Sequence, residues 1–242
     1  TGIGTNALLD IVDGEYNVAV GYQSAQNLTS GDENIVLGTN ALNLATVTTN
    51  CIAIGRNAMQ SVTTNAVDSA IAIGYGAFTG AAGTTTGANN TIAIGKSALS
   101  ALTSGAGNTA VGYSAASLLV EGQYNTVLGY QAFDAGQEDS RCVAIGYQAL
   151  TSADVSDTGS AVTTENTAVG FQAGESTTTG KQNTYIGATA GDALQTGSNN
   201  TYLGYGTEAS ATGASNQTMI GSGVTGVADN SVTLGNADVT RV

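Results

Sequence analysis

A glycine recurs along the 242-residue sequence at a nearly constant interval, and this period constrains the fold more than any other feature. Nine of the thirteen intervals between successive glycines are 17 residues long, and the other four are 19, 21, 24 and 14. A fixed period of this kind is the signature of a repeat architecture in which each unit stacks on its neighbours. The anchoring glycines are Gly4, Gly21, Gly38, Gly55, Gly74, Gly95, Gly112, Gly129, Gly146, Gly170, Gly187, Gly204, Gly221 and Gly235.

Other residues keep fixed places around these glycines. Alanine stands three residues after the glycine in ten of the fourteen units, and asparagine stands four residues before it in seven. The residue directly before the glycine is aliphatic in all fourteen. This aliphatic row consists of Ile3, Val20, Leu37, Ile54, Ile73, Ile94, Val111, Leu128, Ile145, Val169, Ile186, Leu203, Ile220 and Leu234.

The unit reads as one turn of a β-solenoid. A period of 17 residues is too short for a helical hairpin. The stretch from asparagine to glycine, as in residues 108–112, alternates with period two, which is typical of a strand. We therefore expect each coil to contain a strand, a bend at the glycine, a short second strand through the alanine, and a turn. The sequence predicts an all-β parallel solenoid, or β-roll, of about fourteen coils.

This solenoid is expected to form one domain over residues 1–242, with residues 229–242 as a terminal coil leading to a downstream domain. Because the chain starts at Thr1 and carries no signal-peptide pattern, we read it as a segment of a longer fibre protein. Stacked strands lie about 4.8 Å apart, so fourteen coils would make a rod about 65 Å long.

Composition excludes several classes of function. The chain has no histidine, which removes Ser-His-Asp and Cys-His catalysis and His-ligated zinc. The net charge of −13 argues against nucleic acid and anionic membranes as partners. No run of 18 apolar residues is present, so we expect no membrane insertion in this segment. The absence of proline suits a chain in which every strand needs its backbone donors.

Alternation within the strand places the small residue and the aliphatic residue on opposite faces. If the alanines fill the narrow interior, the aliphatic row forms an outward stripe that needs covering by other chains, and a closed homo-oligomer is the natural solution. The alternative turns the aliphatic row inward and allows a monomer.

Three stretches resemble the head repeats of trimeric autotransporter adhesins: Ile71-Ala72-Ile73-Gly74, Ile92-Ala93-Ile94-Gly95 and residues 230–235. The stretch 230–242 is also similar to the end of phage tail-fibre repeats. The resemblance implies a left-handed β-roll, intertwined or packed as a homotrimer. The 17-residue unit is longer than the usual adhesin-head repeat, and the Gly-Tyr-Gln-Ala wording at Gly129 and Gly146 is closer to viral fibres.

Two cysteines occupy the same repeat position, four residues before their glycines. Cys51 and Cys142 lie five coils apart, which at about 4.8 Å per coil rules out a bond within the chain. We expect small buried residues that replace asparagine in its row. A bond between symmetry-related chains is the alternative.

An aromatic column follows the glycines and is expected to form a structural ladder, with sugar binding as the alternative. Its members are Tyr22, Tyr75, Tyr113, Tyr130, Tyr147, Phe171 and Tyr205.

The longer intervals predict loops that leave the solenoid, and such loops often carry binding residues. The candidate receptor contacts are Thr84, Thr85, Thr86, Asp154 and Asp157, with tolerated insertions as the alternative.

Acidic groups cluster in three places, at residues 10–15, 32–33 and 134–139. We expect solvated surface there and no cofactor. A Ca²⁺ ion held by turn carboxylates is the alternative, although no known calcium-loop spacing is present.

These observations favour a non-enzymatic fibre segment of a phage tail fibre, which supports or makes attachment to a host receptor, possibly a glycan. The alternative is the head of a bacterial trimeric autotransporter adhesin, and a polysaccharide depolymerase is the remote one. Each places the protein outside the cell, on a virion or on the bacterial outer surface.

Overall fold

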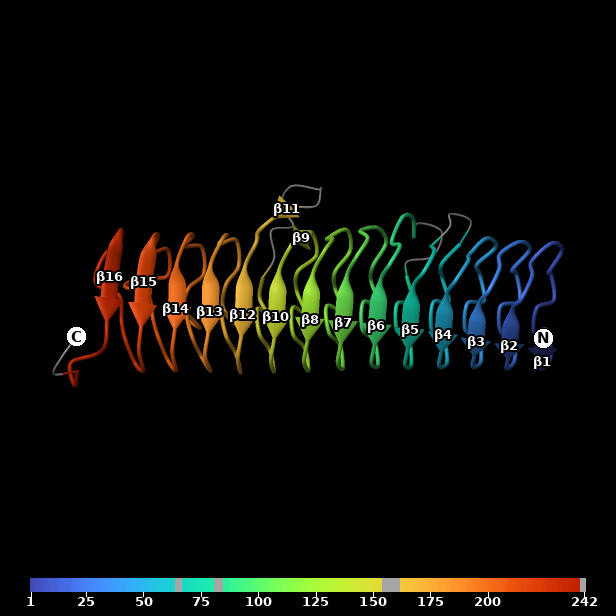
Figure 1. Cartoon of the computed structure of the whole chain (residues 1–242), viewed down its shortest axis with the longest axis horizontal. Coiled ribbons are helices and arrows are strands. Elements are labelled where there is room, and N and C mark those ends of the chain that lie inside the picture. Colours follow the sequence, from blue (N-terminus) through green and yellow to red (C-terminus); the bar gives the residue numbers. More distant parts are fainter. Residues whose placement is uncertain (64–66, 81–84, 154–161, 240–242) are drawn as a thin grey trace.

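The computed structural model describes residues 1–63, 67–80, 85–153 and 162–239, and it forms a rod built around one parallel sheet. Fourteen strands follow one another in sequence order, as Figure 1 shows from blue at the N-terminal end to red at the C-terminal end. The predicted all-β solenoid with its 17-residue period is confirmed. The strands of this sheet are β1 (Gly2–Ile3), β2 (Val18–Val20), β3 (Ile35–Leu37), β4 (Ile52–Ile54), β5 (Ile71–Ile73), β6 (Ile92–Ile94), β7 (Thr109–Val111), β8 (Thr126–Leu128), β10 (Val143–Ile145), β12 (Thr167–Val169), β13 (Thr184–Ile186), β14 (Thr201–Leu203), β15 (Gln217–Ile220) and β16 (Ser231–Leu234).

A smaller parallel pair lies beside this sheet. Strand β9 (Asp139–Ser140) pairs with β11 (Val162–Thr163) in the longest coil. The chain there leaves the 17-residue pattern and makes one extra rung.

The prediction of a second strand through the alanine is wrong. After the glycine the chain makes hydrogen-bonded turns, in which the backbone N–H of Ala98 donates to the carbonyl of Gly95 at 3.4 Å. Residues on either side of the alanine have left-handed backbone, as at Gln131 (φ 48°) and Phe133 (φ 55°). A backbone that alternates in this way cannot run as an extended strand.

The anchoring glycine is required by backbone conformation and by the next coil. Gly38 has a φ of +138°, and a Cβ atom added there would lie 2.6 Å from the carbonyl oxygen of Gly55. Any side chain at this bend would therefore push two coils apart.

The small residue of each strand lines the interior, as expected. Ala19, Ala53, Ala110 and Ala144 are all fully buried. The alanine three after the glycine is also buried in most coils, as at Ala41 and Ala132. In the last third of the rod Tyr185 and Tyr202 replace the strand alanine and stack inside at 5.0 Å between ring centroids. Their bulk is accommodated by Gly174 and Gly191, which lie against the Tyr185 ring.

The asparagines before each strand form a buried polar ladder. Asn34 accepts the backbone N–H of Cys51 through its side-chain oxygen at 2.9 Å, and its amide donates to the carbonyl of Thr48 at 2.7 Å. Asn108 makes the same pair of contacts with the backbone of Asn125 and Gly122. Each buried amide thus satisfies one donor and one acceptor of the next coil, and this is the physical reason for the residue.

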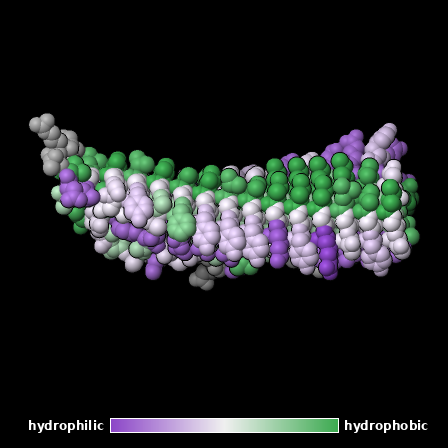
Figure 2. Space-filling model, turned by 90° about the horizontal axis from the view of Figure 1, so that it is seen from below, coloured by the Kyte–Doolittle hydropathy of each residue, from purple (hydrophilic) through white to green (hydrophobic). Residues whose placement is uncertain are grey.

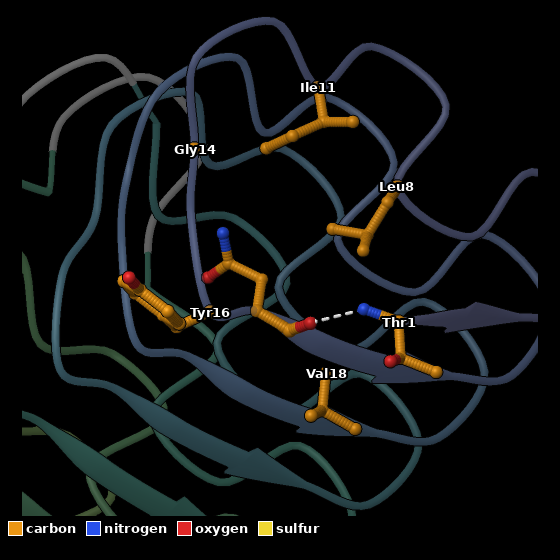
Figure 3. A pocket seen from close by; sticks show the side chains of 7 residues that line it. Thr1, Leu8, Ile11, Gly14, Tyr16 and Val18 are labelled. Carbon is orange, nitrogen blue, oxygen red and sulfur yellow. Dashed lines mark hydrogen bonds between the residues drawn. The ribbon is translucent and has the colours of Figure 1, made fainter.

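At the N-terminal end the interior opens into a hollow lined by Leu8, Ile11, Gly14, Tyr16 and Val18, among others (Figure 3). The ammonium group of Thr1 donates to the carbonyl of Asn17 at 2.5 Å. This bond repeats the one that every later coil makes at the same place, such as Val18 to Asn34. The hollow is therefore the exposed cross-section of the solenoid.

Candidate functional site

The most extensive candidate surface is the outer face of the sheet. Side chains at the first and third positions of each strand point outward, so the predicted outward direction of the aliphatic row is confirmed. Leu128, Ile186 and Leu203 are 48%, 41% and 43% exposed. Figure 2 shows the result as a green band along the rod, with a paler band of more polar side chains beside it.

This face is wider in its apolar part near the N-terminus. In β2 to β6 both outward positions are aliphatic, as in Ile52 and Ile54 of β4 or Ile92 and Ile94 of β6. From β7 to β15 the first position is threonine, except at Val143. The sequence analysis identified only the third-position row. The first-position row could have been found by aligning the units on their glycines.

The two long borders of the face carry opposite charge in its N-terminal half. Glu33 precedes β3 and Asp68 precedes β5, so both lie at the border where strands begin. Arg56 follows β4 and Lys96 follows β6, at the border where strands end. The side chains of Glu33, Arg56 and Lys96 are exposed.

The aromatic column runs along the border where strands end. Tyr113, Tyr130, Tyr147 and Phe171 stack in succession with centroid separations of 5.0, 5.3 and 5.3 Å and nearly parallel planes. The predicted ladder is confirmed for these four rings. Because each inner ring faces its neighbours, Tyr130 and Tyr147 present edges to solvent, which leaves little ring face for a sugar to stack on.

Two cations belong to this column, which the sequence analysis missed. Lys96 Nζ lies 5.9 Å from the Tyr75 ring centroid and 5.5 Å from that of Tyr113. The guanidinium carbon of Arg56 lies 5.7 Å from the other side of the column at Tyr75. These distances are those of cation–π contacts. The signal was present, because both residues directly follow an anchoring glycine.

The predicted receptor residues are only partly described. Thr84, Asp154 and Asp157 lie outside the described residues. Thr85 is fully buried, so it is not placed to touch a receptor, whereas Thr86 is exposed. The backbone N–H of Thr86 donates to the carbonyl of Thr103 at 2.7 Å, which ties the segment to the next coil.

The cysteines are free and buried, as the sequence analysis expected of small residues in the asparagine row. Cys51 Sγ lies 3.1 Å from the carbonyl of Val67, and Cys142 Sγ lies 3.0 Å from the hydroxyl of Thr164. Burial raises the pKa of the Cys51 thiol to about 11 and that of Cys142 to about 12. A bond to another chain would require opening of the coil.

Several clustered acidic residues bond to the backbone. The carboxylate of Asp32 accepts the backbone N–H of Glu15 at 2.7 Å, and Asp134 accepts the hydroxyl of Ser117. Within the described ranges no group of three acidic, cysteine or histidine side chains is arranged to hold a metal ion.

The most perturbed carboxyl group was not anticipated. Burial and a hydrogen bond with Asp192 raise the pKa of Glu208 to about 8. The hydroxyl of Tyr202 is buried nearby and has no hydrogen-bond partner. In the preceding coil Tyr185 bonds to Thr177 at 2.8 Å, and the residue equivalent to Thr177 here is Leu194, which offers no partner.

No model of a known protein family matches the sequence, and no curated protein matches it significantly. The described residues include no helix long and apolar enough to cross a membrane.

Proposed function

We propose that this chain is a non-enzymatic segment of an extracellular fibre that assembles by association of identical chains through the outer face of its sheet. The continuous aliphatic row carries the proposal. Monomeric proteins rarely expose a contiguous apolar patch beyond a few hundred Å², and this row spans all fourteen strands. Identical chains arranged in a closed ring, most simply a homotrimer, would cover it along the full length.

The charged borders support a parallel arrangement of the chains. In a rotationally symmetric assembly with parallel rods, the border of one copy where strands begin lies next to the border of its neighbour where strands end. Glu33 and Asp68 of one copy would then approach Arg56 and Lys96 of the next, within about one coil spacing along the rod. Parallel rods also bring the two-row aliphatic halves together.

The mechanical role follows from the fold. Every coil is bonded to the next through strand ladders, buried asparagines and stacked rings, which makes a stiff spacer. The sequence resemblance favours a phage tail-fibre segment that supports or makes host attachment. The head of a bacterial trimeric autotransporter adhesin is the second candidate. A self-cleaving chaperone domain downstream would favour the first, and a coiled coil with a membrane barrel the second.

Light scattering coupled to size-exclusion chromatography tests the assembly. We expect a mass of three times the 23.8 kDa chain. Leu128→Glu, on the outer face, should lower the mass toward that of one chain because it buries a charge at the interface. Leu118→Glu is the matched control, since Leu118 is 50% exposed, close to the 48% of Leu128, but lies in the turn after β7. A wild-type monomer, or equal loss of mass in both variants, contradicts the proposal.

A further inference from the structure

The column of residues that directly follow the anchoring glycines is interrupted in a way that repeats one of its own sites. Only two non-aromatic members of this column have an aromatic residue on both sides. Lys96 stands between Tyr75 and Tyr113, and Ala188 stands between Phe171 and Tyr205. At the first position a cation fills the place of the missing ring. At the second there is only a methyl group.

The backbones of the two positions match. Residues Ser97 and Ser114 donate to the carbonyls of Tyr75 and Lys96 at 3.0 and 2.9 Å. In the other triplet, the residues after Ala188 and Tyr205 donate to the carbonyls of Phe171 and Ala188 at 2.8 and 3.0 Å. In both triplets the outer residues are therefore two coils apart, about 10 Å along the rod.

The rings that flank Ala188 are available. Phe171 stacks on Tyr147 with one face, at an interplanar angle of 9°, which leaves the opposite face directed along the rod toward the level of Ala188. Phe171 is 48% exposed and Tyr205 is 66% exposed. Lys96 shows that a cation in this interval lies within 6 Å of both ring centroids.

We propose that Phe171, Ala188 and Tyr205 form a binding position for an organic cation that carries a methylated ammonium group. Such a group is attracted by the electron-rich faces of two rings at once. The methyl groups suit the site better than a primary ammonium does, because Phe171 and Ala188 offer no side-chain acceptor for N–H donors. The net charge of −13 draws cations toward the rod.

This inference does not rest on the proposed function, since it concerns the border column and not the outer face of the sheet. The position holds a single cation between two rings, so the expected affinity is in the millimolar range. Neighbouring rods or a repeating ligand would raise the apparent affinity by multivalency.

Titration with tetramethylammonium chloride, followed by the upfield shift of its methyl protons in NMR, tests the site on the whole chain. We expect saturable binding at one site, reduced at least about threefold in Phe171→Ala and in Tyr205→Ala, since each removes one of two rings. Ala188→Lys should abolish binding, because its ammonium group would take the place that Lys96 takes in the first triplet. Tyr22→Ala is the control, as Tyr22 is 51% exposed in the same column but has no aromatic residue two coils away.

Removal of the internal cation gives the sharpest arm. Lys96→Ala should create a second site between Tyr75 and Tyr113, so that the stoichiometry rises from one to two. Tert-butyl alcohol, a neutral molecule of similar shape, should not bind. Undiminished binding in Ala188→Lys, equal binding of the neutral molecule, or an unchanged stoichiometry in Lys96→Ala would each overturn the proposal.

Discussion

The side-chain oxygen of Asn125 accepts the backbone N–H of Cys142, one coil further along the rod, at 2.9 Å. The amide group of the same side chain donates to the carbonyl of Asp139 at 2.8 Å. Both bonds are buried, so a single side chain satisfies two backbone groups that would otherwise be orphaned inside the solenoid. The stack is thus held by side-chain rungs as well as by strand ladders.

Asn125→Ala should destabilise the protein by about 2–5 kcal/mol, because it leaves one buried donor and one buried acceptor without partners. Urea unfolding followed by circular dichroism measures this loss. The control is Gln195→Ala, which alters an exposed side chain with no side-chain hydrogen bond in the described part of the chain. Equal midpoints for the two variants would show that the rung contributes nothing.

Gly38→Ala should be much more damaging than Gly87→Ala. The new methyl group at residue 38 would lie 2.6 Å from the carbonyl oxygen of Gly55, whereas nothing lies within 4 Å of the corresponding position at Gly87. Both glycines have positive φ, at +138° and +69°, so backbone strain alone is represented in the control. We expect a loss of about 1 kcal/mol for Gly87→Ala and several for Gly38→Ala. Similar thermal midpoints would argue against close coil contact at the bend.

The buried thiols should make the fold sensitive to alkali. The folded pKa values of about 11 for Cys51 and about 12 for Cys142 lie above the ordinary value of 9.0, since burial disfavours the thiolate. Their contribution to stability is therefore complete below about pH 9 and is lost as the pH rises through 11 to 12. The double variant Cys51→Ala, Cys142→Ala should show a shallower fall of the thermal midpoint over this window.

The same thiols should resist alkylation in the native protein. Iodoacetamide at pH 8 should modify neither Cys51 nor Cys142 until the chain is unfolded, because both are buried and protonated. Intact mass spectrometry with and without urea gives the result. Modification of the folded protein at the rate of a free cysteine would contradict the buried position.

Glu208 should destabilise the fold as the pH rises. Burial and the bond with Asp192 raise its pKa from 4.5 to about 8, so the native state favours the protonated acid. Its contribution is present below about pH 4.5 and is lost as the pH rises through 8. Glu208→Gln should therefore raise the thermal midpoint relative to wild type at pH 9 and change it little at pH 4. An equal effect of the exposed control Glu15→Gln would remove the explanation.

Much of the architecture was predictable because the period and the alternation are strong signals. The pattern of Ala110 and Val111 fixed which side chain points inward and which outward, and the structure agrees. The turn after the glycine was not predictable, since Leu99 and Phe133 adopt left-handed backbone that such residues ordinarily avoid. Packing between coils imposes that conformation, and no local sequence preference signals it.

The asparagine row shows the opposite case, in which the signal was present but its cause was misread. Asparagine was interpreted as turn chemistry, yet Asn34 and Asn125 are buried rungs. A pattern that follows from the rungs can now be seen in the sequence. All four intervals that differ from 17 residues begin in coils with another residue at this place, namely Cys51, Ala70, Cys142 and Gln217. The rung and the regular coil length therefore occur together.

The stacking of self-similar coils has a consequence for how the gene can change. A unit such as the one from Asn108 to Asn125 meets only the units before and after it, and both junctions have the same rung, strand and bend. Unequal recombination between neighbouring repeats would therefore insert or delete whole units and leave each new junction compatible. The reach of the rod can vary between descendants in steps of about 4.8 Å, with both ends unaltered.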